Sequence, residues 1–307
     1  MIVKYINSAG TEVNLNQSPY KMLVSDILDY EWEPVEVSGK IAGFKKAMAS
    51  KEINIDVLKD KAGSRQNLSF LTDIFEKDVV AVTPGKLYID EYYISCFIVK
   101  SEKDNWETDV LTSCTFGLIS DNPVWVKETL FQFLPKDVQE GGKENVPVIT
   151  GGDYAGESVE NNAVVREFTF EFLRPSDKKV SYPQFDLPFD FIQKQGERIL
   201  DNTSFADSNF IMTIYGFVDT PSILIAEHPY TIHTIVYEGE RIVIDSAAGI
   251  VKKIGRLGEE TNLYSARDMA YSIFQKIPSG AQTVIWPGTY GVDILLKDER
   301  SEPKWSL

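Results

Sequence analysis

Cysteine is scarce in this chain, with only Cys96 and Cys114 among 307 residues. Two cysteines do not form the dense disulfide framework of small secreted domains. Neither has a second ligand residue at the short spacing of a zinc site, so we expect no metal there. A hairpin centred on Asn105, midway between them, would place the two thiols opposite each other. The simpler expectation is two buried, small apolar residues.

Positive charge is also in short supply. The 31 Lys and Arg residues stand against 46 Asp and Glu residues, which gives a net charge of −15. Binding to nucleic-acid phosphates or to anionic lipids requires a basic surface, so we expect neither specific nucleic-acid binding nor a membrane partner. If the chain lined a channel through which DNA passes, however, the same acidic charge would repel the DNA phosphates and prevent binding.

Long apolar runs are absent as well. No stretch reaches the ~20 residues that a membrane-spanning helix needs. Residues 1–15 lack the basic region followed by an apolar run that marks a signal peptide. We therefore expect a protein that is made in a cytoplasm and stays soluble.

Histidine occurs only twice, as His228 and His233, on either side of Pro229. Helical zinc motifs place two histidines four residues apart, and an odd spacing on a strand puts them on opposite faces. No Gly-x-Ser-x-Gly nucleophile elbow is present. We expect both histidines to serve packing or hydrogen bonding.

Two further patterns resemble sites only superficially. Aspartates recur through one loop-rich region at spacings too wide for a calcium loop, and we expect solvated side chains there. The glycine pairs 141–142 and 151–152 are not followed by Lys-Ser/Thr, so they predict flexible backbone and not a phosphate loop. We assign no catalytic, cofactor-binding or metal-binding residue and expect no cofactor. The widely spaced aspartates of the loop-rich region are Asp186, Asp190, Asp201, Asp207 and Asp219.

Four aromatic residues of the C-terminal part are candidates for a sugar-stacking platform. Aromatic faces stack on sugar rings, but the same residue types also anchor cores and protein interfaces. We expect core or interface roles for them. They are Tyr215, Tyr230, Trp286 and Trp305.

What the sequence does contain favours a mainly β protein of two domains. It is 43% hydrophobic and 12% aromatic, with 14 Tyr and 17 Phe residues, and aromatic residues favour strands. A length of 307 residues suffices for two cores.

In the N-terminal part, period-two alternation and turn residues predict a series of strands. Glu52–Leu58 is the clearest case, with Ile53, Ile55 and Val57 on one side. Ile27–Val37 is expected to be a strand with one buried face. The other expected elements are a hairpin over Ile2–Leu15 and strands over Lys86–Ile89, Tyr92–Lys100 and Asp109–Ile119.

Asn67–Val79 changes to a helical period and predicts the single helix of this part. Four apolar residues fall on one stripe, and Ser64 is the candidate N-cap. The stripe consists of Leu68, Leu71, Ile74 and Phe75.

Residues 136–180 change in composition, with glycine and asparagine pairs among acidic residues, and predict a linker, an arm or an extended insertion. Arg166–Phe172 within it is expected to be a strand. A β-sandwich is expected to follow, with a short helix at Ala266–Gln275. Its strands are expected at Phe210–Tyr215, Ser222–Ala226, Tyr230–Tyr237, Glu240–Ile244, Thr283–Ile285 and Tyr290–Leu296.

Six short motifs, taken in order along the chain, resemble the distal tail proteins of siphovirus-type phages. They are INSAGTEVNL (6–15), FGLISDNPVW (116–125), IYGFVDTPSILI (214–225), GERIVID (239–245), IPSGAQTVIW (277–286) and RSEPKW (300–305). The resemblance implies a tail-tube-like split β-barrel with one helix over residues 1–135, and a galectin-like β-sandwich over 181–307.

The resemblance also implies a virion tail-tip location and a structural role without catalysis. Six copies would form a ring that joins the tail tube to the tail-tip hub and presents receptor-binding or peripheral proteins. The implied partners are the chain itself, the tail-tube protein, the hub protein and receptor-binding proteins. Alternatives are a carbohydrate-binding module for the host wall, a glycan-cleaving tail-tip enzyme, and the equivalent baseplate component of a contractile tail or bacteriocin.

Overall fold

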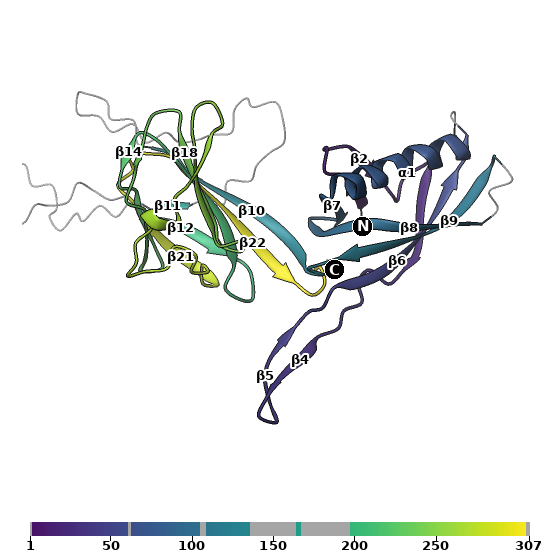
Figure 1. The fold of residues 1–307 in the computed structure, drawn as a ribbon, viewed down its shortest axis with the longest axis horizontal. Helices are drawn as coiled ribbons and strands as arrows, with labels where there is room; N and C mark the ends of the chain where they lie inside the picture. Colours follow the sequence, from purple (N-terminus) through teal and green to yellow (C-terminus); the bar gives the residue numbers. More distant parts are fainter. Residues whose placement is uncertain (1, 61–62, 105–108, 136–163, 167–196, 305–307) are drawn as a thin grey trace, which may run out of the picture. The chain divides into compact units, whose positions relative to one another are not determined.

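The computed structural model describes most of the chain, and in this part it is mainly β with a single α-helix (Figure 1). The described residues are 2–60, 63–104, 109–135, 164–166 and 197–304. The sequence-based fold class, mainly β with one helix in the N-terminal part, is confirmed.

The chain divides into two compact units. Unit 1 comprises Met1–Lys127 together with Glu299–Leu307, and unit 2 comprises Glu128–Asp298. The chain passes from one unit to the other twice, once within strand β10 (Trp125–Phe133) and once within strand β22 (Val292–Arg300). Of the expected linker 136–180, only Val164–Arg166 is described, where it forms strand β11.

Unit 1 contains two antiparallel sheets that share one long strand. One sheet has the order β2-β1-β7-β8, and the other has the order β3-β6-β9-β8. The first part of β8 pairs with β7 and its second part with β9, so the sheets meet along β8 without closing into a barrel. The strands are β1 Val3–Ile6, β2 Glu12–Asn14, β3 Tyr20–Ser25, β4 Glu33–Val37, β5 Lys40–Lys45, β6 Ala49–Leu58, β7 Gly85–Ile89, β8 Tyr92–Asp104 and β9 Leu111–Ser120.

Helix α1 (Ser64–Ala81) packs on β6, β8 and β9 through the stripe predicted from the sequence. Leu68, Leu71, Ile74 and Phe75 are all buried, which confirms the helical period. The Phe75 ring packs edge-on against Tyr5 and Phe116, with centroids 5.0 and 5.2 Å apart. The helix thereby covers the core of unit 1.

The predicted N-cap of this helix is wrong by one residue. Gly63 occupies the cap position with φ +86°, a conformation that glycine adopts without strain, and Ser64 is the first helical residue. The Ser64 hydroxyl is buried without a hydrogen-bond partner among the described residues. The Arg65 amide donates instead to Asp109 Oδ1 at 3.2 Å, so a distant carboxylate caps the helix.

A buried carboxylate near the other end of α1 ties the helix to the N-terminal hairpin. Asp78 is fully buried, accepts a 2.6 Å hydrogen bond from the Tyr5 hydroxyl, and accepts a 2.7 Å bond from the Ser8 amide. Burial and the Asp78 hydrogen bond raise the pKa of Tyr5 far above its usual value, so the phenol stays protonated and donates. Gly85 lies against both side chains.

We predict that Gly85→Ala destabilises unit 1 by about 1–3 kcal/mol, the usual cost of overpacking a filled core. An added Cβ would lie 2.2 Å from the Tyr5 hydroxyl oxygen and 2.4 Å from Asp78 Oδ2. Gly43→Ala is the matched control, because nothing lies within 4 Å of its Cβ position. Chemical denaturation measures both, and equal stability of the two variants would contradict the prediction.

Unit 2 is a β-sandwich of two antiparallel sheets around one core. The first sheet has the order β10-β22-β13-β18-β19-β20, and the second has the order β11-β12-β21-β15-β16. Phe210 and Met212 from the first sheet share the core with Ile223 and Val284 from the second. The remaining strands are β12 Glu197–Asn202, β13 Asn209–Tyr215, β14 Val218–Asp219, β15 Ser222–Ile225, β16 His228–Thr231, β17 Ile235–Val236, β18 Arg241–Asp245, β19 Ile250–Ile254, β20 Glu260–Asn262 and β21 Gly280–Ile285.

Three predicted elements are wrong. The expected strand Tyr230–Tyr237 is not continuous, because β16 ends at Thr231 and β17 covers only Ile235–Val236. The expected helix Ala266–Gln275 is absent, and only the 3-10 turn η1 (Tyr264–Ala266) forms. The Asp268 and Ser272 side chains accept hydrogen bonds from amides two residues on, which favours turns over a helix. In the expected strand Ile27–Val37, only Glu33–Val37 is a strand, and it is exposed throughout. The expected strand Arg166–Phe172 lies outside the described residues beyond Arg166.

Candidate interaction surface

The β4–β5 hairpin (residues 33–45) stands apart from the sheets of unit 1. Its strands pair only with each other in the described part of the chain, and Figure 1 shows it projecting from the rest of unit 1. Val37 pairs with Lys40 across the two-residue turn Ser38-Gly39, in which both residues have positive φ. This geometry matches the right-handed twist of the two strands and fixes their register.

The hairpin exposes apolar side chains to solvent on both strands. Val37, Ile41 and Phe44 are 58%, 61% and 60% exposed. A lone two-stranded hairpin is only marginally stable in water, and unpaired strand edges invite pairing with another chain. Exposed apolar clusters of this kind mark interaction sites. The hairpin is therefore the candidate interaction surface of unit 1.

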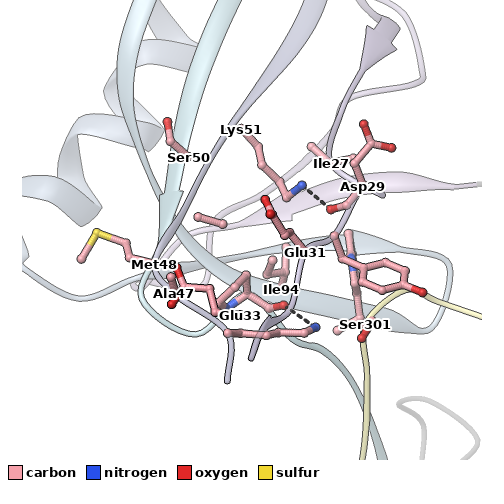
Figure 2. Close-up of a pocket in the computed structure, with 15 residues that line it drawn as sticks. Ile27, Asp29, Glu31, Glu33, Ala47, Met48, Ser50, Lys51, Ile94 and Ser301 are labelled. Atoms are coloured by element: carbon pink, nitrogen blue, oxygen red, sulfur yellow. Dashed lines mark hydrogen bonds between the residues drawn. The ribbon is translucent and has the colours of Figure 1, made fainter. Parts of the chain in front are cut away.

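A cavity of about 430 Å³ lies at the root of the hairpin (Figure 2). Its lining combines carboxylates, two lysines and apolar side chains from the segments before β4 and after β5. Ile94, Trp125 and Ser301 also line the cavity, from other strands of unit 1 and from the C-terminal residues. The remaining lining residues are Ile27, Asp29, Tyr30, Glu31, Glu33, Lys46, Ala47, Met48, Ala49, Ser50, Lys51 and Pro123.

Both lysines at this root are held by backbone carbonyls. Lys46 Nζ donates to the Pro123 carbonyl at 3.0 Å. Lys51 Nζ donates to the Asp26 carbonyl at 2.9 Å and to that of Asp29, toward which Figure 2 shows it pointing. Burial lowers the pKa of Lys46, and the nearby charge of Lys51 lowers it further. The two ammonium groups thus join the segment before β4 and the loop after β9 to the residues that follow β5.

The two cysteines are buried and free, and they do not face each other. Cys96 pairs with Gly85, and Cys114 pairs with Lys103 and with Ile55. A hairpin centred on Asn105 is therefore wrong, because the β8–β9 pairing places the turn closer to Cys114. The simpler prediction, buried small apolar residues, is confirmed.

We predict that neither thiol reacts with a thiol reagent at pH 8 in the folded chain. Burial raises the pKa of Cys96 to about 12 and that of Cys114 to about 11, so the reactive thiolate is rare at this pH. Both thiols should titrate after denaturation. A colorimetric thiol assay measures this, and rapid reaction without denaturant would contradict the assignment.

The histidines and the described aspartates do not converge. His228 lies in β16, where ring Nε2 donates to the Ser272 carbonyl at 2.8 Å, whereas His233 is exposed. Asp201, Asp207 and Asp219 are exposed, as expected of solvated side chains. Asp186, Asp190 and the glycine pairs lie outside the described residues. Within the part that the structure describes, no three His, Cys, Asp or Glu side chains are placed to hold a metal ion.

Of the three described aromatic candidates, Tyr230 and Trp286 are buried and only Tyr215 is partly exposed. Trp286 is buried and donates from Nε1 to the Tyr290 carbonyl at 3.1 Å. Tyr230 is buried and donates to the Gln275 carbonyl at 2.9 Å. Tyr215 is partly exposed and donates to Asp293, whereas Trp305 lies outside the described residues. Core packing therefore accounts for Trp286 and Tyr230.

Sequence reasoning missed the hairpin, although its turn carries a signal. Ser38-Gly39 separates two short runs that are rich in Val, Ile and Phe, which is a hairpin pattern. Strand β10 was missed as well.

Among the helices in the described ranges, none is long and apolar enough to cross a membrane.

Comparison with solved structures shows that the fold is similar to that of chains in a phage baseplate. A chain from the structure of the phage P2 baseplate in its activated conformation with Ca superposes with a TM-score of 0.54 and 10% sequence identity, over 99% of this chain and 100% of that chain. The corresponding structure with Sr gives a TM-score of 0.55 and 10% identity, over 98% and 99%. The chain thus has the fold of a phage baseplate protein along almost its whole length.

A third solved structure is that of the SPP1 Dit (gp 19.1) protein, described as a paradigm of the hub adsorption apparatus in phages that infect Gram-positive bacteria. It gives a TM-score of 0.49 and 7% identity, over 97% of this chain and 99% of that chain. No protein-family model and no curated protein sequence matches this chain.

Proposed function

We propose that this chain is a structural component of a phage tail tip. Unit 1, which contains most of the N-terminal domain predicted over residues 1–135, forms a ring with further copies of itself. The ring joins the tail tube to the tail-tip hub. The resemblance of the sequence motifs to distal tail proteins implies that it contains six copies. The sandwich within residues 181–307 carries receptor-binding or peripheral baseplate proteins, and no catalytic step is assigned to either unit.

The observation that carries this proposal is the β4–β5 hairpin. Its exposed Val37, Ile41 and Phe44 need a protein partner to remove them from water. In the proposed ring, the hairpin of one copy meets a different part of unit 1 in the next copy, which makes the contact head-to-tail. Contacts of this type generate rings when the rotation between copies closes.

The fold likeness and the charge support the same role. The chain superposes over almost its full length on a protein of the phage P2 baseplate, an assembly of a virion tail. The net charge of −15 suits the wall of a channel through which DNA passes without binding. Trp286 and Tyr230 are buried, so they offer no sugar-stacking platform to the carbohydrate-binding alternative.

Light scattering and negative-stain electron microscopy of the full chain test the proposal. Closed rings of uniform size are expected, with their population rising with protein concentration. A chain that stays monomeric at the highest soluble concentration, alone and mixed with tail-tube and hub proteins, would refute the ring.

A further inference from the structure

One side chain at the root of the hairpin contacts two other segments of unit 1 and so joins three segments, its own included. Lys46 follows β5 directly, and its Nζ lies 4.9 Å from the ring centre of Trp32 and 5.8 Å from that of Tyr30, both just before β4. The same Nζ donates to the Pro123 carbonyl in the loop between β9 and β10. Lys46 therefore links both ends of the hairpin to the body of unit 1.

The neighbouring lysines have different roles. Lys51 binds the carbonyls of Asp26 and Asp29, which fastens the segment before β4 to the start of β6 but does not reach the β9–β10 loop. Lys45 pairs with Glu33 at 3.4 Å, within the hairpin, and its side chain is 65% exposed. Of these three lysines, only Lys46 contacts both ends of the hairpin and the loop together.

We propose that Lys46 is a positioning residue that fixes the direction of the β4–β5 hairpin relative to the body of unit 1. The hairpin strands pair with no other described strand, so the contacts at its root set where it points. A hairpin held in one direction loses less conformational entropy when its exposed apolar side chains meet a partner. The inference about assembly rests on the proposed ring, whereas the inference about direction does not.

The partial burial of Lys46 agrees with this role. Burial lowers the pKa of its ammonium group, so the charge gives up hydration that the Pro123 carbonyl and the two rings replace. A lysine that served only solubility would keep its ammonium group in water, as the exposed Lys45 side chain does.

Spin labels at the hairpin turn and on the helix measure the direction of the hairpin in the full chain. Ser38→Cys and Lys77→Cys introduce two exposed labelling sites in unit 1, and the native Cys96 and Cys114 are buried. Pulsed electron paramagnetic resonance then gives the distribution of distances between the two labels. We expect a single narrow distribution when Lys46 is present.

Lys46→Met keeps the apolar stem but removes the ammonium group, and we expect it to replace the narrow distribution by a broad one. Lys45→Met is the matched control, because it removes one charge at the adjacent position and only the Glu33 ion pair. Trp32→Leu removes the larger of the two rings that contact Lys46 and should also broaden the distance distribution. This variant still tests the proposal if Lys46→Met does not fold.

An unchanged distribution in folded Lys46→Met or Trp32→Leu would overturn the proposal, and so would equal broadening in Lys45→Met. Ring assembly, followed in the same samples, should fall with Lys46→Met and not with Lys45→Met. If the wild-type chain forms no rings with any tail protein, the proposed function fails, but the distance distributions still decide the role of Lys46.

Discussion

Replacing Ile41 by aspartate should lower the affinity between copies of the chain at least about 30-fold, as expected of a change worth ~2 kcal/mol or more at the centre of an interface. Ile41 lies on β5 and is 61% exposed, so the isolated chain should fold as before. In the assembled ring, the new carboxylate would lose its water without gaining a partner. Concentration-dependent light scattering of both chains measures the effect.

The control for this variant is the same type of substitution on another exposed apolar residue. Val80 lies on α1 and is 84% exposed, so Val80→Asp adds an identical charge to unit 1 away from the hairpin. It should leave assembly unchanged if the hairpin is the contact. Equal loss of assembly in Ile41→Asp and Val80→Asp would contradict the prediction. It would mean that association depends on net charge and not on the hairpin.

Asp78→Ala should lower the free energy of unfolding of unit 1 by about 3–5 kcal/mol, because it leaves buried donors without an acceptor and opens a cavity. The two donors are the Tyr5 hydroxyl and the Ser8 amide, each within 2.7 Å of the Asp78 carboxylate. Hydrogen exchange of the α1 amides reports on unit 1 separately, since a two-unit chain need not unfold in one step.

Two further variants sharpen this test. Tyr5→Phe removes one of the two hydrogen bonds and should cost about 1.5–3 kcal/mol, because the lost bond is to a buried carboxylate that is left one donor short. Asp73→Ala changes an exposed aspartate of the same helix and should cost little. If Asp78→Ala behaves like Asp73→Ala, the buried carboxylate does not hold the helix to the N-terminal hairpin.

Periodicity predicted the parts of the fold in which side chains sort cleanly between core and solvent. Ile53, Ile55 and Val57 alternate on β6 and are all fully buried, and the apolar stripe of α1 faces the same core. These elements bury one face each, so the sequence pattern follows directly from their environment.

The remaining elements depend on contacts that no local pattern encodes. Val35 and Val37 resemble residues of a half-buried strand, but they lie on a hairpin that no other strand of the described chain covers. Apolar residues that contact a partner and apolar residues that pack in the core give the same pattern in the sequence. The candidate surface was therefore missed, and so was the Lys46 contact, which joins residues far apart in sequence.

The order of the two units along the chain has a consequence for engineering. Unit 2 begins and ends inside unit 1, which resumes at Glu299 after the sandwich is complete. Ser301, from this returning stretch, lines the cavity at the root of the hairpin. Residues 128–298 can therefore be exchanged for another domain as one continuous segment. Such a chimera would retain both pieces of unit 1, residues 1–127 and 299–307.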